Sequence, residues 1–147
     1  MPDDKNNRKL DSASKAMFEE GIKARREVLG DAHVDRSLRN ATEFSLPIQQ
    51  LATEVGWGVI WTRPGISRKT RSYMNIGMLC ALGKSHELGV HVRGAVRNGL
   101  TEEEIQEALL HATVYSGFPA GLEAFRVAGQ VLEEMKKSGE LRPKAKL

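Results

Sequence analysis

Residues 85–112 read SHELGVHVRGAVRNGLTEEEIQEALLHA, and they contain two helices whose ends are clearly marked. Ser85 suits an N-cap and Gly99 a C-terminal stop, with apolar residues recurring at helical spacing between them. Thr101, followed three residues later by Glu104, forms a capping box that opens the next helix. Because no segment of the chain shows sustained alternation of polar and apolar residues, we predict an all-α fold.

The remaining sequence predicts four further helices, for about six in total. They run from about Ser12 to Leu29, from Thr42 to Val55 with an interruption near Pro47, from Ser67 to Leu82, and from Pro119 to Lys137. The second of these stops at Gly56-Trp57-Gly58, and a loop with a turn at Arg63-Pro64-Gly65 follows it. In the helix that starts at Ser67, the side chains expected to be buried are Met74, Met78 and Ala81.

The composition is that of one globular domain with short polar ends. The chain has 147 residues, of which 40% are hydrophobic and 28% charged. We expect residues 11–137 to form the folded domain, between a flexible tail at residues 1–10 and a flexible basic tail at residues 138–147. No apolar stretch suits a secretory signal or a membrane span, and the single cysteine, Cys80, excludes an internal disulfide. These features predict a cytoplasmic protein with no membrane partner.

The positive charge of the chain lies in its tails. The formal net charge is +3, but residues 11–137 contain equal numbers of basic and acidic side chains. A protein that binds nucleic acid concentrates positive charge on its folded surface. We therefore expect no nucleic-acid partner.

Both tryptophans of the chain, Trp57 and Trp61, lie four residues apart and just before Arg63. Indole rings offer a flat apolar surface, and a guanidinium group can hold a carboxylate through two parallel hydrogen bonds. The segment could therefore bind a small anion. Composition alone, however, favours a packed loop whose arginine caps a helix.

Glu87 and His91 are four residues apart on a predicted helix and therefore share a face. A carboxylate beside an imidazole can fix its tautomer and raise its basicity, as acid–base catalysis requires. A solvated pair on the helix surface is the alternative. His86 and His91 are five residues apart and do not match the HExxH zinc motif, so we predict no metal site.

Three further polar side chains are candidates for binding an anion. Tyr115 places a phenol between two predicted helices, and Arg71 and Arg93 lie on the helices that start near Ser67 and Ser85. Each arginine could equally be a solvated surface charge.

Five short segments follow one another in the order found in the carboxymuconolactone decarboxylase family, which this chain resembles. They are WGVIWTRPG at 57–65, RKTRS at 68–72, ELGVHVRGA at 87–95, NGLTEEEI at 98–105 and YSGFPA at 115–120. The similarity extends from about Val28 to Leu132, and the first segment resembles the decarboxylase branch in particular. It implies an alkylhydroperoxidase D-like helical bundle that assembles into a ring-like hexamer with its sites near subunit contacts.

The related alkylhydroperoxidases carry the motif CxxCxxxH on the corresponding helix. Lys84, Glu87 and His91 occupy these three positions here, so the histidine alone is retained. Thiol peroxidase chemistry needs two sulfurs that close a disulfide, and Cys80 has no partner. The sequence therefore disfavours thiol peroxidase activity.

The resemblance implies the conversion of 4-carboxymuconolactone to 3-oxoadipate enol-lactone and CO2, in the protocatechuate branch of the β-ketoadipate pathway. No cofactor is expected, because the conjugated lactone carbonyl of the substrate can accept the electrons that CO2 leaves behind. In this interpretation His91, oriented by Glu87, returns a proton to carbon, and Arg63, or as second choice Arg71, anchors the second carboxylate.

The remaining candidates would shape the pocket around this small anionic lactone. Trp57 and Trp61 would form an apolar wall beside the leaving carboxylate, which must be poorly solvated. Tyr115 would contact a substrate oxygen.

Three other functions remain open on the sequence. The same residues could serve an isomerase, cyclase or dehydratase that acts on a related lactone or keto acid. A thiol-based antioxidant enzyme is disfavoured by the single cysteine. A helical oligomer that binds a ligand without turnover is the third alternative.

Overall fold

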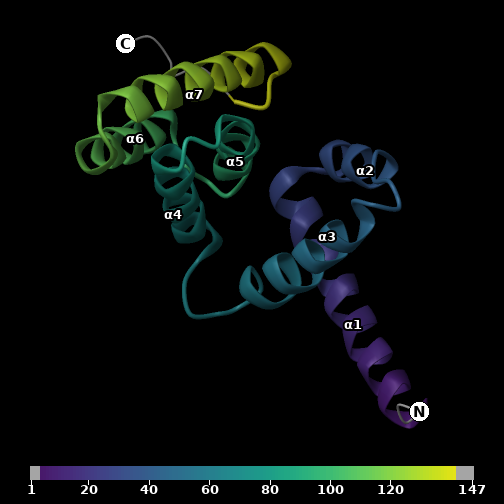
Figure 1. Cartoon of the computed structure of the whole chain (residues 1–147). Coiled ribbons are helices and arrows are strands. Elements are labelled where there is room, and N and C mark those ends of the chain that lie inside the picture. Colours follow the sequence, from purple (N-terminus) through teal and green to yellow (C-terminus); the bar gives the residue numbers. More distant parts are fainter. Residues whose placement is uncertain (1–3, 142–147) are drawn as a thin grey trace. The chain divides into compact units, whose positions relative to one another are not determined.

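The computed structural model describes residues 4–141, with side chains from residue 11 onward. Every regular element in this range is a helix, which confirms the all-α prediction (Figure 1). The helices are α1 (Asp4–Leu29), α2 (Asp31–Arg39), α3 (Leu46–Leu51), η1 (Ala52–Ile60), α4 (Arg68–Ala81), α5 (Ser85–Arg97), α6 (Glu102–Ser116) and α7 (Phe118–Ser138). Their backbone contacts divide the chain into two compact units, Met1–Ile66 and Ser67–Leu147.

The ends of the chain differ in part from the sequence prediction. Helix α1 begins at Asp4 and not near Ser12, so it includes most of the predicted N-terminal tail. Helix α7 ends at Ser138, where Gly139 adopts a left-handed φ of 78°. The rest of the two tails, residues 1–3 and 142–147, lies outside the described residues, and the flexibility of the tails stays a prediction. No helix among the described residues is long and apolar enough to cross a bilayer.

In the first unit, η1 packs along α1 and directly continues α3. The predicted interruption at Pro47 is wrong, because this proline occupies the first turn of α3, where its missing N–H has no partner to lose. The predicted turn at Pro64-Gly65 is present, but the loop begins only after Ile60 and not directly after Val55. The chain forms a π-helix there, and the hydrogen bond from Trp61 N to Gly56 O shows its i→i+5 pattern.

Two glycines let α1 and η1 approach each other closely. A Cβ atom on Gly21 would lie 2.0 Å from the carbonyl oxygen of Thr53, and one on Gly58 would lie 2.2 Å from that of Met17. Each distance is far below van der Waals contact, so a side chain at either position would push the helices apart. Backbone proximity, more than interlocking side chains, sets this crossing.

Helix α2 was not predicted. Gly30 ends α1, as expected, with a φ of 86° that L side chains rarely adopt. The chain then starts a second helix at once, with Asp31 in its first turn and Arg39 in its last, as the helix dipole favours. Val34 is fully buried, and Asp35 accepts a 2.7 Å hydrogen bond from Arg26, which fastens α2 to α1.

The second unit packs α4 to α7 around one apolar core (Figure 1). Helix α4 contributes Ile76 and Cys80, which corrects the expectation that Met74, Met78 and Ala81 are buried, since all three are exposed. Helix α4 is apolar on two faces, and periodicity alone cannot decide which one meets the core. The other core side chains are Leu88, Val92, Ala95, Leu100, Ile105, Leu109, Ala112, Ala124, Ala128 and Leu132.

The helix ends of the second unit match the sequence closely, with one exception. The capping box of Thr101 and Glu104 is present at the start of α6, as predicted. Ser85, by contrast, is not an N-cap. Lys84 occupies that position, and the Ser85 hydroxyl donates a 3.0 Å hydrogen bond to Glu123 of α7.

Candidate functional site

His91 of α5 meets Asn75 of α4 inside the second unit. The Asn75 side-chain nitrogen donates a 3.2 Å hydrogen bond to Nδ1 of His91, and both residues are half-buried. Because an amide nitrogen can only donate, Nδ1 must act as the acceptor. In this arrangement the neutral imidazole carries its proton on Nε2.

Glu87 lies one turn before His91 and is exposed in the first turn of α5. The sequence analysis predicts that Glu87 orients the imidazole of His91. In the structure the Asn75 amide nitrogen contacts Nδ1 of His91, so Asn75 and not Glu87 holds this ring nitrogen. Sequence reasoning missed Asn75, because its partner is 16 residues away on another helix and no local motif joins the two.

Arg71 lies one turn before Asn75 on α4, so the two residues share a face of this helix. It is half-buried, as Asn75 is. The structure therefore places a cation, an amide and an imidazole on neighbouring positions of α4 and α5. Arg93, the other candidate on these helices, forms ion pairs with Glu134 and Glu140 and fastens α5 to the C-terminal part of the unit.

Tyr115 lies on the last turn of α6 and is 81% exposed. Its ring centroid is 5.1 Å from that of His111. Both side chains line a cavity of about 400 Å³ whose walls are mostly small or aromatic residues of α4 and α6, and His91 is not among them. The structure thus does not bring Tyr115 beside His91 within this unit.

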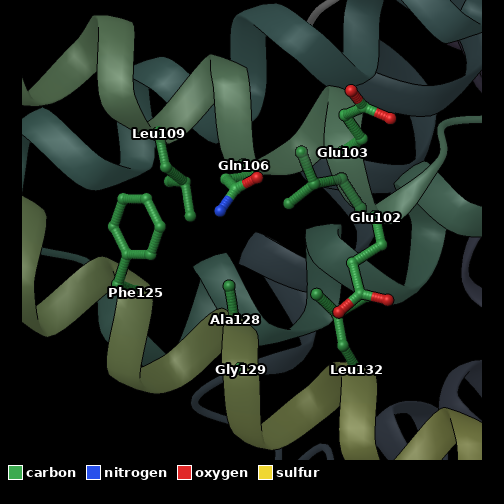
Figure 2. A pocket seen from close by; sticks show the side chains of 9 residues that line it. Glu102, Glu103, Gln106, Leu109, Phe125, Ala128, Gly129 and Leu132 are labelled. Atoms are coloured by element: carbon green, nitrogen blue, oxygen red, sulfur yellow. The ribbon is translucent and has the colours of Figure 1, made fainter.

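A second cavity of the unit, of about 420 Å³, lies between α6 and α7. Figure 2 shows Leu109 and Phe125 on its apolar side, with Glu102 and Glu103 at the other end. Two carboxylates repel an anionic ligand, so this cavity does not suit the substrate class predicted from the sequence.

Trp57, Trp61 and Arg63 belong to the first unit. The two indole rings stack with their centroids 4.8 Å apart and an interplanar angle of 24°. Both tryptophans are more than 90% buried, which supports the packing role that composition favours. Arg63 follows η1 and is exposed.

Arg25 is a buried cation that sequence reasoning did not single out. It is 7% exposed, and its guanidinium donates a 3.2 Å hydrogen bond to the Thr53 hydroxyl. Burial lowers the pKa of Arg25, because the charged form loses hydration. Thr53 in turn donates to the Gln49 carbonyl, so this chain of hydrogen bonds joins α1 to the start of η1.

Charged pairs elsewhere in the second unit join helix ends. Lys69 of α4 lies 2.7 Å from Glu104 of α6, and this contact lowers the pKa of the Glu104 carboxyl. Among the side chains of residues 11–141, no three histidine, cysteine or acidic groups gather as a metal site would require.

Comparison with known proteins identifies the family. Residues 47–130 match the model of the carboxymuconolactone decarboxylase family. The nitrosuccinic acid decarboxylase of Metarhizium robertsii is 47% identical over 88% of this chain and 91% of its own length. The 4-carboxymuconolactone decarboxylase of Acinetobacter baylyi is 40% identical over 80% of this chain and 88% of its own length. Similarity of this extent shows that the chain is a decarboxylase of the carboxymuconolactone decarboxylase family.

Proposed function

We propose that this protein removes CO2 from a small dicarboxylate in which an electron-withdrawing group, adjacent or conjugated, can accept the electron pair of the broken bond. The first candidate is 4-carboxymuconolactone, with 3-oxoadipate enol-lactone as the product. The observation that carries the proposal is the 40% identity to a decarboxylase of that name over 80% of the chain. The half-buried pair of His91 and Asn75 supplies the acid–base group that the reaction needs.

The substrate itself accepts the electrons of the broken bond. When the bond to the carboxylate breaks, CO2 leaves and the electron pair moves through the double bond into the lactone carbonyl as a dienolate. A proton must then return to carbon. His91 delivers it from Nε2 as an imidazolium, becomes a neutral imidazole that keeps its other proton on Nδ1, and regains a proton on Nε2 from water.

Arg71 is our first choice for the anchor of the carboxylate that stays, because it shares a face of α4 with Asn75. A guanidinium group holds a carboxylate in a defined orientation through charge-assisted hydrogen bonds. Arg63 is the alternative anchor, because it lies in the WGVIWTRPG segment that resembles the decarboxylase branch of the family. The leaving carboxylate needs an apolar environment and no tight partner, because a strong contact would stabilise the ground state. Trp57, Trp61 and Tyr115 stay candidates for the pocket wall.

Nitrosuccinic acid is a second candidate substrate, favoured by the 47% identity to the fungal enzyme named after it. It also has two carboxyl groups, and its nitro group can take the electron pair as a nitronate. The two candidates therefore ask the same of the protein: an anchor for one carboxylate and a proton for carbon. Comparison of kcat/KM for the two compounds tests the choice. We expect the lactone to be preferred, and a higher kcat/KM for nitrosuccinate would reassign the substrate.

We further propose that the protein forms a homo-oligomer, a hexamer by family resemblance. The second unit supports self-association, because it exposes large apolar side chains on three helices. On α4, α6 and α7, and at the C-cap of α4, these are Met74, Met78, Leu82, Leu110, Val114, Tyr115, Phe118 and Leu122. Apolar surface of this kind marks an interaction site in a natural protein.

A further inference from the structure

We propose that Asn75 is a positioning residue that decides which nitrogen of His91 carries the transferable proton. The inference rests on the proposed function of His91 and adds a residue to it. Its basis is the 3.2 Å hydrogen bond from the Asn75 amide nitrogen to Nδ1. Asn75 acts through His91 and needs no contact with the substrate.

The hydrogen bond from Asn75 of α4 holds the His91 imidazole at its Nδ1 atom. Neutral histidine exists as two tautomers, and a donor at Nδ1 leaves the proton on Nε2. Both residues are held by helices that pack against each other through the same core, with Ile76 next to Asn75 and Val92 next to His91 fully buried. The backbone on each side of the hydrogen bond is thereby fixed, so the ring keeps one orientation.

An asparagine can serve His91 in both of its charge states. Rotation of the amide by half a turn exchanges its nitrogen and oxygen with little change of shape. The amide nitrogen donates to Nδ1 of the neutral ring, and the amide oxygen accepts from Nδ1–H of the imidazolium. In the resting neutral ring and in the imidazolium Nε2 therefore carries a proton, and after the imidazolium has given up that proton the amide oxygen holds the remaining Nδ1–H. An aspartate of the same size could only accept, and would hold the proton on Nδ1.

The test is the tautomer of His91, read from the ¹⁵N chemical shifts of its ring in the full-length protein. The measurement is made about two pH units above the ordinary histidine pKa of about 6.5, where a neutral ring is expected. A His91→Gln spectrum identifies the His91 signals among the four histidines of the chain. We expect the Nε2–H form in the wild type, the Nδ1–H or imidazolium form in Asn75→Asp, and a mixture of tautomers in Asn75→Ala.

Asn98→Asp is the matched control. Asn98 is also half-buried, and its amide nitrogen donates to the Ser72 hydroxyl of α4 over 2.9 Å. This variant places the same carboxylate beside the same helix without touching His91. We expect it to lower stability and to leave the His91 tautomer unchanged.

Activity separates the inference from the proposed function. We expect Asn75→Ala to lower kcat with little change in KM, by less than the roughly 10²–10⁴-fold loss that removal of the acid itself causes. Identical His91 shifts in the wild type and both Asn75 variants would overturn the inference, even if the protein is an active decarboxylase. Changed shifts without any CO2 release would support the tautomer assignment and reject the proposed function.

Discussion

His91 is the residue on which the proposed chemistry depends most. We expect His91→Ala to lower kcat for decarboxylation by roughly 10²–10⁴-fold, because an oriented proton donor contributes about that factor. His86→Ala is the matched control, since His86 is exposed on the same helix and has no role in the account. Stopped-flow or manometric detection of CO2 measures both variants. A kcat of His91→Ala close to that of the wild type would show that His91 is not the proton donor.

The two arginine candidates make different predictions. If Arg71 anchors the remaining carboxylate, Arg71→Met should raise KM by about 10- to 100-fold, since a hydrogen bond to a charged group contributes about 1.5–3 kcal/mol. Arg63→Met should change KM much less. Initial-rate kinetics on both variants decide between them. A larger effect from Arg63→Met would transfer the anchor to the segment after η1.

The sequence predicted which single residues are candidates for the site better than it predicted which residues contact each other. Helix spacing and family resemblance pointed to His91, which the structure holds through Asn75. The same spacing pointed to Glu87 as its partner, because i and i+4 positions are the contacts that a sequence displays. A contact between two helices leaves no such local signal.

The crossing of α1 and η1 depends on Gly58. We expect Gly58→Ala to lower the free energy of unfolding by about 1–3 kcal/mol, because its Cβ atom would lie 2.2 Å from the Met17 carbonyl oxygen. Gly56→Ala is the control on the same helix, with no atom within 4 Å of the added methyl group. It should raise stability by about 0.5–1 kcal/mol, as alanine does in a helix. Urea denaturation measures both changes. Equal effects would show that the helices do not meet at Gly58.

Glu123 links α7 to Ser85 at the start of α5 and contributes to stability in a way that depends on pH. Hydrogen bonds from Arg126 and Ser85 lower its pKa from 4.5 to about 2. A carboxyl whose folded-state pKa is depressed stabilises the fold above the unfolded pKa, and this contribution is lost as the pH falls towards 2.

We therefore expect Glu123→Gln to lower Tm at pH 7. The Tm difference from the wild type should shrink between about pH 4.5 and pH 2 as the wild-type carboxyl becomes protonated. Thermal unfolding followed by circular dichroism at several pH values measures it. A difference that stays constant over this range would show that the charge of Glu123 contributes nothing. Glu107→Gln, at an exposed position of α6, controls for a general loss of negative charge.

Helix ends were predictable where capping residues mark them. Thr101 caps α6 as predicted and α4 begins after Ser67, whereas Ser85, the other predicted cap, does not cap α5. The π-helix was not predictable, because Gly56 and Gly58 are read as helix breakers on local propensity. The lack of a side chain at Gly58 is what lets this segment lie against α1. Packing between elements thus overrides the local preference, and the tryptophans move from a predicted loop into the core of the first unit.

At the scale of the whole molecule, several large apolar side chains of α4, α6 and α7 are exposed to solvent. Exposed apolar patches of this kind mark interaction surfaces. We predict that the wild type sediments as an oligomer well above the 16.3 kDa of one chain. Met78→Glu, at a half-exposed position of α4, should lower the mass observed by analytical ultracentrifugation, because burial of an unpaired carboxylate is costly. Gln130→Glu adds the same charge at an exposed polar position of α7 and should leave the assembly intact. A monomeric wild type would contradict the prediction.

The division of the chain into two units was not visible in the sequence. Composition predicted one folded domain over residues 11–137, because it does not record which helices contact each other. The structure places His91, Asn75 and Arg71 in one unit and Trp57, Trp61 and Arg63 in the other. The family resemblance pointed to candidate residues in both units. The structure shows the contacts that each candidate makes within its own unit, such as His91 with Asn75 and Trp57 with Trp61.

The most direct test of the account is CO2 release from freshly prepared 4-carboxymuconolactone by purified protein dialysed against a chelator. We predict rapid release without added metal, thiol or nucleotide, because the substrate is its own electron acceptor and the protein supplies only an anchor and a proton. Absence of release by folded protein, with both this lactone and nitrosuccinate, would contradict the account.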